Sequence, residues 1–112
     1  MPQYLLLLHE DPAQYADVSP EDMQRIVARY AEWSAGLRAG GRIVGGQKLR
    51  EEGGRHVRPG GAVTDGPYAE GKEVLGGFFT VEADDYDGAV AVARDCPHLA
   101  YGWVEVREID PT

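Results

Sequence analysis

Apolar residues recur along the chain with two different periods, and each period predicts a different kind of element. Residues 4–8 are an apolar run between polar neighbours, which predicts a strand buried on both faces. Residues 42–49, 75–82 and 103–109 predict three further strands, and the polar residues that alternate along the last one indicate a solvated face. A Gly-rich segment predicts a small hairpin in which residues 55–58 pair with residues 62–64 around a turn at 59–61.

Two segments have the three- and four-residue spacing of an amphipathic helix. The first begins after Ser19, a natural N-cap, with Pro20 at the first helical position, and it ends at Gly40-Gly41. Its predicted apolar face consists of Met23, Ile26, Val27, Tyr30, Trp33 and Leu37. The second helix is capped by Asp84 or Asp85 and runs to about Arg94, because Pro97 prevents its continuation.

The order of these elements is β-α-β, a hairpin, then β-α-β. This order indicates an α+β fold, a ferredoxin-like sandwich with both helices on one face of an antiparallel sheet. Two helices cover only one face, yet residues 4–8 and Phe78-Phe79 are apolar at successive positions and so present apolar side chains to both faces. An uncovered apolar face of this extent marks an interface, so we expect a homodimer with face-to-face sheets.

Composition places the chain among ordinary globular proteins. Its 112 residues predict one domain, residues 1–112, and the formal net charge of -8 argues against affinity for nucleic acid or an anionic membrane. Six cationic residues between positions 38 and 58 form either a solvated face or an anion-accepting rim. The single cysteine, Cys96, is predicted to be a buried structural thiol. The apolar run near the start is too short for a secretion signal or a membrane span, so we expect a cytoplasmic location.

The stretch "TDGPYAEGKEVLGGFFTVE", residues 64–82, resembles the segment that names the DGPF group of YCII-related proteins, with Tyr68 in place of Phe and Gly71 in place of Thr. The start "QYLLLLHEDP" and the end "CPHLAYGWVEVREI" are also similar to that family. The resemblance implies a dimeric α/β-barrel fold. It also implies a suspected enzymatic function with a His-Asp pair in a cavity, and certain bacterial members are encoded beside extracytoplasmic-function sigma factors.

The residues themselves offer candidates for such chemistry. His9 ends the first predicted strand and is the candidate catalytic base, and Asp65 is the carboxylate best placed to orient it. The alternative is that Asp65 forms an Asx-type turn and that His9 is only a polar strand end. The compact YCII branch carries its suspected histidine near the start of the first helix, where this chain has none. The residues expected to bind a ligand are Tyr30, Trp33, Tyr68, Phe78 and His98.

The sequence lacks the common motifs of several enzyme classes. It has no zinc-site spacing, no HExxH, no phosphate-binding lysine loop, no dinucleotide fingerprint and no Gly-x-Ser-x-Gly elbow, so we expect neither a metal nor a cofactor. Two hypotheses follow. The first is an enzyme-like or ligand-binding dimer that handles a small organic molecule by His/Asp acid-base chemistry. The second is a non-catalytic regulatory or interaction module for a protein partner such as a sigma factor.

Overall fold

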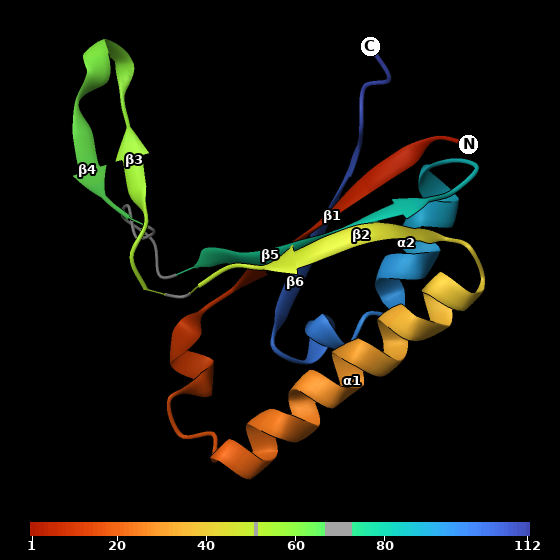
Figure 1. The fold of residues 1–112 in the computed structure, drawn as a ribbon, viewed down its shortest axis with the longest axis horizontal. Coiled ribbons are helices and arrows are strands. Elements are labelled where there is room, and N and C mark those ends of the chain that lie inside the picture. The colour runs from red at the N-terminus through yellow and green to blue at the C-terminus, as the bar shows by residue number, and fades with distance from the viewer. Residues whose placement is uncertain (51, 67–72) are drawn as a thin grey trace.

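The computed structural model describes residues 1–50, 52–66 and 73–112. Four long strands and two helices form the body of the molecule, with a separate hairpin and three short 3-10 helices (Figure 1). In chain order these elements are β1 (Gln3–Glu10), η1 (Pro12–Tyr15), α1 (Pro20–Ala39), β2 (Ile43–Lys48), β3 (Arg55–Val57), η2 (Pro59–Gly61), β4 (Val63–Asp65), β5 (Val74–Glu82), α2 (Tyr86–Arg94), η3 (Pro97–Ala100) and β6 (Gly102–Glu108).

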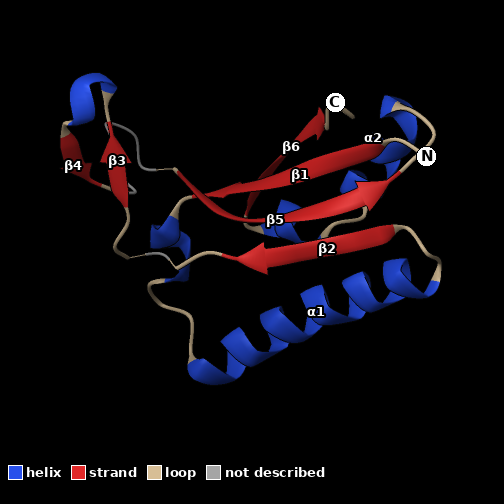
Figure 2. Cartoon of the chain, turned by 45° about the horizontal axis from the view of Figure 1, so that its top comes forward, coloured by secondary structure: helices blue, strands red, loops and turns tan. Residues whose placement is uncertain are grey.

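The four long strands form one sheet in the order β2-β5-β1-β6, and every neighbouring pair is antiparallel. Both helices lie on the same face of this sheet (Figure 2). The arrangement confirms the predicted ferredoxin-like α+β fold. The hairpin of β3 and β4 forms a second small sheet and projects beyond the end of the first (Figure 1).

Side-chain caps explain where the two helices begin. The Ser19 hydroxyl accepts a hydrogen bond from the Asp22 backbone N–H at 3.1 Å, which satisfies one of the free donors in the first turn of α1. In α2 the same role belongs to Asp85, whose carboxylate accepts from the Gly88 N–H at 2.8 Å. The sequence predicts either Asp84 or Asp85 as the cap, and in the structure the cap is Asp85.

Strand β1 continues two residues further than its apolar run predicts. Burial alternates along its whole length, so Tyr4, Leu6, Leu8 and Glu10 are buried on the helix side. The residues between them, including Leu5 and Leu7, are only half-buried on the opposite face. The prediction that this strand is buried on both faces is therefore wrong for the single chain, because no element of the described residues covers the second face.

The core lies under α2 and the C-terminal half of α1. Leu6 and Val81 are fully buried there, together with Leu37 from α1 and Ala89 from α2. Cys96 is also buried and unpaired, and burial raises the pKa of its thiol, as expected for a structural residue. The N-terminal half of α1 contributes no residue to this core and lies over a cleft instead. Within the described residues, no helix is both long and apolar enough to cross a membrane.

Candidate functional site

A cleft of about 730 Å³ lies between α1 and the sheet, and its volume falls in the range of small-molecule sites. Strands β1, β2 and β5 form its floor, and the first half of α1 forms one wall. Most of its lining is apolar and comes from Leu8, Met23, Ile26, Val27, Leu49 and Phe79. A small number of polar side chains share this apolar lining.

Glu10 is the buried acid of the cleft. Its position on β1 is in phase with Leu6 and Leu8, so the strand turns the carboxylate toward the helices, and the residue is only 5% exposed. Its Oε2 atom has no hydrogen-bond partner among the described residues. A buried carboxylate oxygen without a donor costs free energy that a ligand donor would recover.

Glycine at position 76 makes room for this carboxylate. A Cβ atom at Gly76 would lie 2.7 Å from Cδ of Glu10 and closer still to Oε1. Gly76 sits at the irregularity where the pairing of β1 with β5 shifts between Leu8 and His9. The glycine therefore provides the space that Glu10 occupies in the cleft.

Two tyrosines face the same cleft, Tyr15 from η1 and Tyr30 from α1. Burial raises the pKa of Tyr15 well above its usual range, and the charge of Glu10 acts in the same direction. Burial also raises the pKa of Tyr30, with smaller contributions from Tyr15, Cys96 and Glu10. Both phenols are therefore neutral hydrogen-bond donors at physiological pH.

His98 holds the hydroxyl of Tyr30 in place. It is 1% exposed, and its Nε2 lies 2.8 Å from the backbone oxygen of His9. A carbonyl oxygen can only accept, so Nε2 carries the proton and Nδ1 of the neutral ring accepts from the Tyr30 hydroxyl at 2.8 Å. Gly102 permits the close approach, since a Cβ there would collide with the His9 carbonyl.

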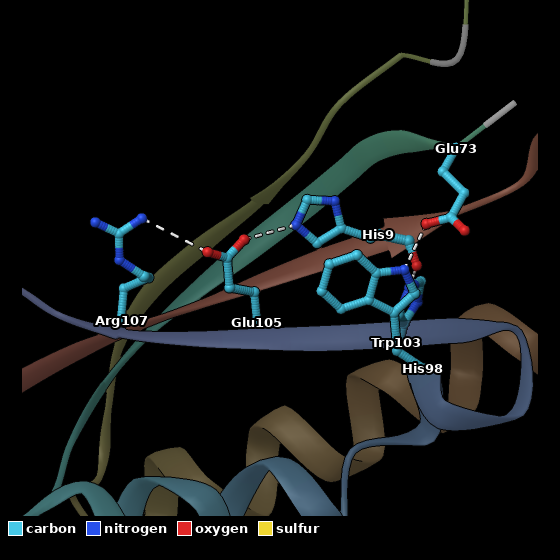
Figure 3. Close-up of polar contacts among 6 residues, drawn as sticks. All are labelled: His9, Glu73, His98, Trp103, Glu105 and Arg107. Atoms are coloured by element: carbon cyan, nitrogen blue, oxygen red, sulfur yellow. Dashed lines mark hydrogen bonds and ion pairs between the residues drawn. The ribbon is translucent and has the colours of Figure 1, made fainter. Parts of the chain in front are cut away.

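His9 itself points to the opposite face of the sheet (Figure 3). Its ring stacks on Trp103 at a centroid distance of 4.1 Å, and its Nε2 lies 3.0 Å from Oε1 of Glu105. Arg107 contacts the second oxygen of that carboxylate at 3.5 Å, and the Trp103 indole donates to Glu73. His9 therefore has a carboxylate partner, supplied by β6.

Asp65 does not supply that partner within one chain. It ends β4 in the projecting hairpin, its side chain is 91% exposed, and its ion-pair contact is Arg55 at 3.5 Å. The expected contact with His9 is absent from the described residues, since the carboxylate that lies against His9 belongs to Glu105. A catalytic role for either His9 or Asp65 stays a prediction.

The residues expected to bind a ligand are distributed over several places. Tyr30 and His98 line the cleft, whereas Trp33 packs edge-on against Phe79 at 5.1 Å and does not line it. Phe78 is paired with Leu7, which points away from the helices. Tyr68 lies outside the described residues.

Sequence reasoning missed Glu10 and Tyr15. The signal for Glu10 was its spacing, because position 10 continues the alternation of Tyr4, Leu6 and Leu8. Tyr15 offered no such signal, since a short 3-10 helix after Pro12 positions it.

The six cationic residues between positions 38 and 58 lie in different places, with Arg38 in the last turn of α1 and Arg42 just before β2. Lys48 and Arg50 line the cleft beside Glu52, whereas Arg55 and Arg58 belong to or flank the hairpin strand β3. Neither Lys48 nor Arg50 forms an ion pair with any other described residue. No cluster of three or more metal-binding side chains occurs within residues 1–50, 52–66 and 73–112.

Comparisons with known proteins agree with this fold. The family model of the YCII-related domain matches residues 2–112. No curated protein matches the chain. Among solved structures, the fold is similar to 5-chloro-2-hydroxyhydroquinone dehydrochlorinase (TftG) from Burkholderia phenoliruptrix AC1100 in complex with 2,5-dihydroxybenzoquinone. The two share 18% identity and a TM-score of 0.51, over 96% of this chain and 93% of that chain, so the likeness concerns the fold alone.

Proposed function

We propose that this chain, which belongs to the YCII-related domain family, binds and transforms a small organic molecule in the cleft between α1 and the sheet. The observation that carries this proposal is the unpartnered Oε2 of Glu10, buried in an apolar cleft. A group of this kind in a concave site is a candidate acid-base residue. The fold similarity to a dehydrochlorinase that was solved with a small organic molecule supports the same class of function.

The chemistry that fits this arrangement is proton transfer. Glu10 accepts the proton of a ligand hydroxyl, and the negative charge that develops on the ligand oxygen is stabilised by a phenol donor. Tyr15 is neutral and lines the same cleft, so its hydroxyl is available as that donor, whereas Tyr30 already donates its one hydroxyl proton to Nδ1 of His98. His98 positions Tyr30, because the His9 carbonyl fixes which nitrogen of its ring is protonated.

Native mass spectrometry tests this function directly. The protein is incubated with a mixture of small phenols and enols, and the bound masses are compared among wild type, Glu10→Gln and Glu32→Gln. Glu32 is the matched control, because it is an exposed glutamate of α1 that does not line the cleft. We expect the wild type and Glu32→Gln to retain the same compounds and Glu10→Gln to lose them. Equal retention by all three proteins would contradict the proposal.

We also propose that a second copy covers the open face of the sheet. This face carries Leu5, Leu7 and Phe78, all half-buried, and it continues into Trp103, which is 46% exposed. At about 25 cal/mol per Å² of apolar surface, burying a few hundred Å² on each chain contributes several kcal/mol to association. The dimeric α/β barrel implied by the sequence resemblance has this form.

Sedimentation velocity tests the dimer with two matched lysine substitutions. Leu7→Lys places a charge at the centre of the open face and is expected to give monomers. Val57→Lys adds the same charge at a residue of the hairpin that is 72% exposed, and it is expected to leave the dimer intact. A monomeric wild type would contradict the proposal, as would a Leu7→Lys protein that still sediments as a dimer.

The hairpin supports a second candidate function, a non-catalytic interaction module. Val57 and Val63 are its exposed apolar residues, and Arg55 and Arg58 add positive charge beside them. Exposed apolar residues rimmed by charge are common in protein-binding surfaces. The partner suggested by the family resemblance is a sigma factor, and a pull-down with such a factor, comparing wild type with Val57→Ser, tests it. Equal recovery with both proteins would contradict a role for the hairpin.

A further inference from the structure

We infer that the ligand of the cleft is a small organic acid that carries a hydroxyl group at its other end. The hydroxyl lies at Glu10 and the acid group lies between Lys48 and Arg50. This inference rests on the proposed function, since it assigns a ligand class to the same cleft. Three features of the cleft support it, namely the chemistry of each end, the distance between the ends and the wall that joins them.

The inner end of the cleft requires a hydrogen-bond donor. Oε2 of Glu10 is buried without a partner, and a carboxylate can only accept hydrogen bonds. A ligand hydroxyl supplies that donor. A ligand carboxylate does not, because it would place two negative charges together in a buried site. The acid group of an organic acid must therefore lie elsewhere in the cleft.

The other end of the cleft is cationic. Lys48, the last residue of β2, and Arg50 line it, and among the described residues Glu52 is the carboxylate that lines the cleft beside them. The chain as a whole carries a net charge of -8, so general electrostatic attraction does not favour anions. One lysine and one arginine at the same end of an apolar cleft provide a local site for a ligand carboxylate.

The register of the sheet gives the distance between the two ends. Glu10 lies on β1, Gly76 beside it lies on β5, and the Leu49 N–H donates to the Gly76 carbonyl at 2.9 Å. Lys48 and Arg50 flank Leu49, so their backbone lies two strand spacings from Glu10, which is about 10 Å. A single aromatic ring with substituents at opposite ends spans this gap once the side chains reach inward. Phe79 and Ile26 line the apolar region in between.

An amine in place of the acid is the main alternative. A ligand ammonium group at Glu10 would pair with the carboxylate but leave Lys48 and Arg50 without a role. At the other end of the cleft, the same group would be repelled by these two cations. A neutral phenol would satisfy Glu10 and gain nothing from the two cations. The three ligand classes therefore differ in how binding responds to each end of the cleft.

The test is a set of protein-observed NMR titrations with four one-ring probes. 4-Hydroxyphenylacetate carries both groups, phenylacetate only the acid, 4-ethylphenol only the hydroxyl, and tyramine a hydroxyl with an amine. Each probe is titrated into wild type, Glu10→Gln and the double variant Lys48→Gln/Arg50→Gln. The matched control is Arg55→Gln/Arg58→Gln, which makes the same change of charge in the hairpin and its flank, away from the residues that line the cleft.

We expect 4-hydroxyphenylacetate to bind most tightly to the wild type, with shifts at amides that border the cleft. Loss of Lys48 and Arg50 is expected to weaken it about three- to tenfold, the range for two partly exposed ion pairs, and to leave 4-ethylphenol unchanged. Glu10→Gln is expected to weaken 4-ethylphenol and not phenylacetate. The control variant is expected to match the wild type with every probe.

Two kinds of result would overturn the inference, and they separate it from the proposed function. If 4-ethylphenol or tyramine binds in the cleft as tightly as 4-hydroxyphenylacetate, or if the control variant weakens binding as much as the cleft variant, the ligand class is wrong while the cleft remains a ligand site. If none of the four probes shifts amides beside Glu10 and Tyr30, both the ligand class and the proposed function fail.

Discussion

Replacement of Tyr30 by phenylalanine removes one hydroxyl from the network behind the cleft. In the wild type that hydroxyl donates to Nδ1 of His98, while Nε2 of the same ring donates to the His9 carbonyl. Tyr30→Phe keeps the aromatic ring and leaves Nδ1 of a residue that is 1% exposed without a donor. The change therefore isolates the cost of one unsatisfied buried acceptor.

The magnitude follows from the position of the bond. Losing a neutral hydrogen bond costs about 0.5–1.5 kcal/mol, and leaving its buried partner unpaired costs about 1–3 kcal/mol. Tyr30 lines the cleft, so water can enter and satisfy part of the loss. We therefore expect Tyr30→Phe to lower the free energy of unfolding by about 1–2 kcal/mol, which is a decrease in Tm on the order of 5–10 °C.

Urea denaturation at a fixed protein concentration measures this loss against a matched control. Tyr86→Phe also removes a phenol hydroxyl, one that accepts from the Glu108 N–H at 2.8 Å at an exposed site. Water replaces that bond, so we expect a cost of about 0.5 kcal/mol or less. Nitrogen-15 NMR of His98 provides a second readout, and we expect the proton on Nε2. The reasoning is refuted if both variants lose equal stability, or if Nδ1 carries the proton in the wild type.

Three further predictions concern the cleft and its surroundings. Gly76→Ala is expected to displace the Glu10 carboxylate and to weaken 4-ethylphenol binding at least about tenfold in the NMR titration. The control is Gly45→Ala, where a Cβ contacts nothing within 4 Å, and this variant is expected to bind 4-ethylphenol normally. The pKa values of Tyr15 and Tyr30 are raised in the folded state. Their contribution to the free energy of unfolding is therefore fully present below the ordinary tyrosine pKa near 10 and is lost as the pH rises above that value. Urea midpoints between pH 8 and 11.5 should therefore fall for the wild type and fall less for Tyr15→Phe/Tyr30→Phe. Cys96 is expected to react with a thiol reagent only at the rate of unfolding, and fast labelling of the folded protein would contradict its burial.

The fold was predictable because its signals are local and mutually consistent. The 3.6-residue spacing in α1, the Ser19 cap and the glycines after the helix all indicate the same element, and the structure contains it at residues 20–39. The order of elements then leaves few topologies, and the ferredoxin-like one is observed. Strand ends were the weak point, since β1 continues to Glu10 although the apolar run ends at Leu8.

The candidate site was predictable only in part. Tyr30 and His98 were expected in a ligand pocket, and both line the cleft, where a hydrogen bond joins them. Glu10 was missed because a charged residue at a strand end is usually solvated, and only the register of β1 against β5 shows that it is buried. Asp65 was expected to orient His9 by analogy with base-orienter pairs, but it ends β4 in the projecting hairpin, and the carboxylate against His9 is that of Glu105.

The central claim is that Glu10 faces a ligand site rather than a structural void. A crystal structure of the protein with 4-ethylphenol tests it most directly. We predict the ring between α1 and the sheet, with the phenol oxygen about 2.5–3.0 Å from Oε2 of Glu10. The claim is contradicted if the phenol binds elsewhere and Oε2 of Glu10 bonds to a protein group or turns out to solvent.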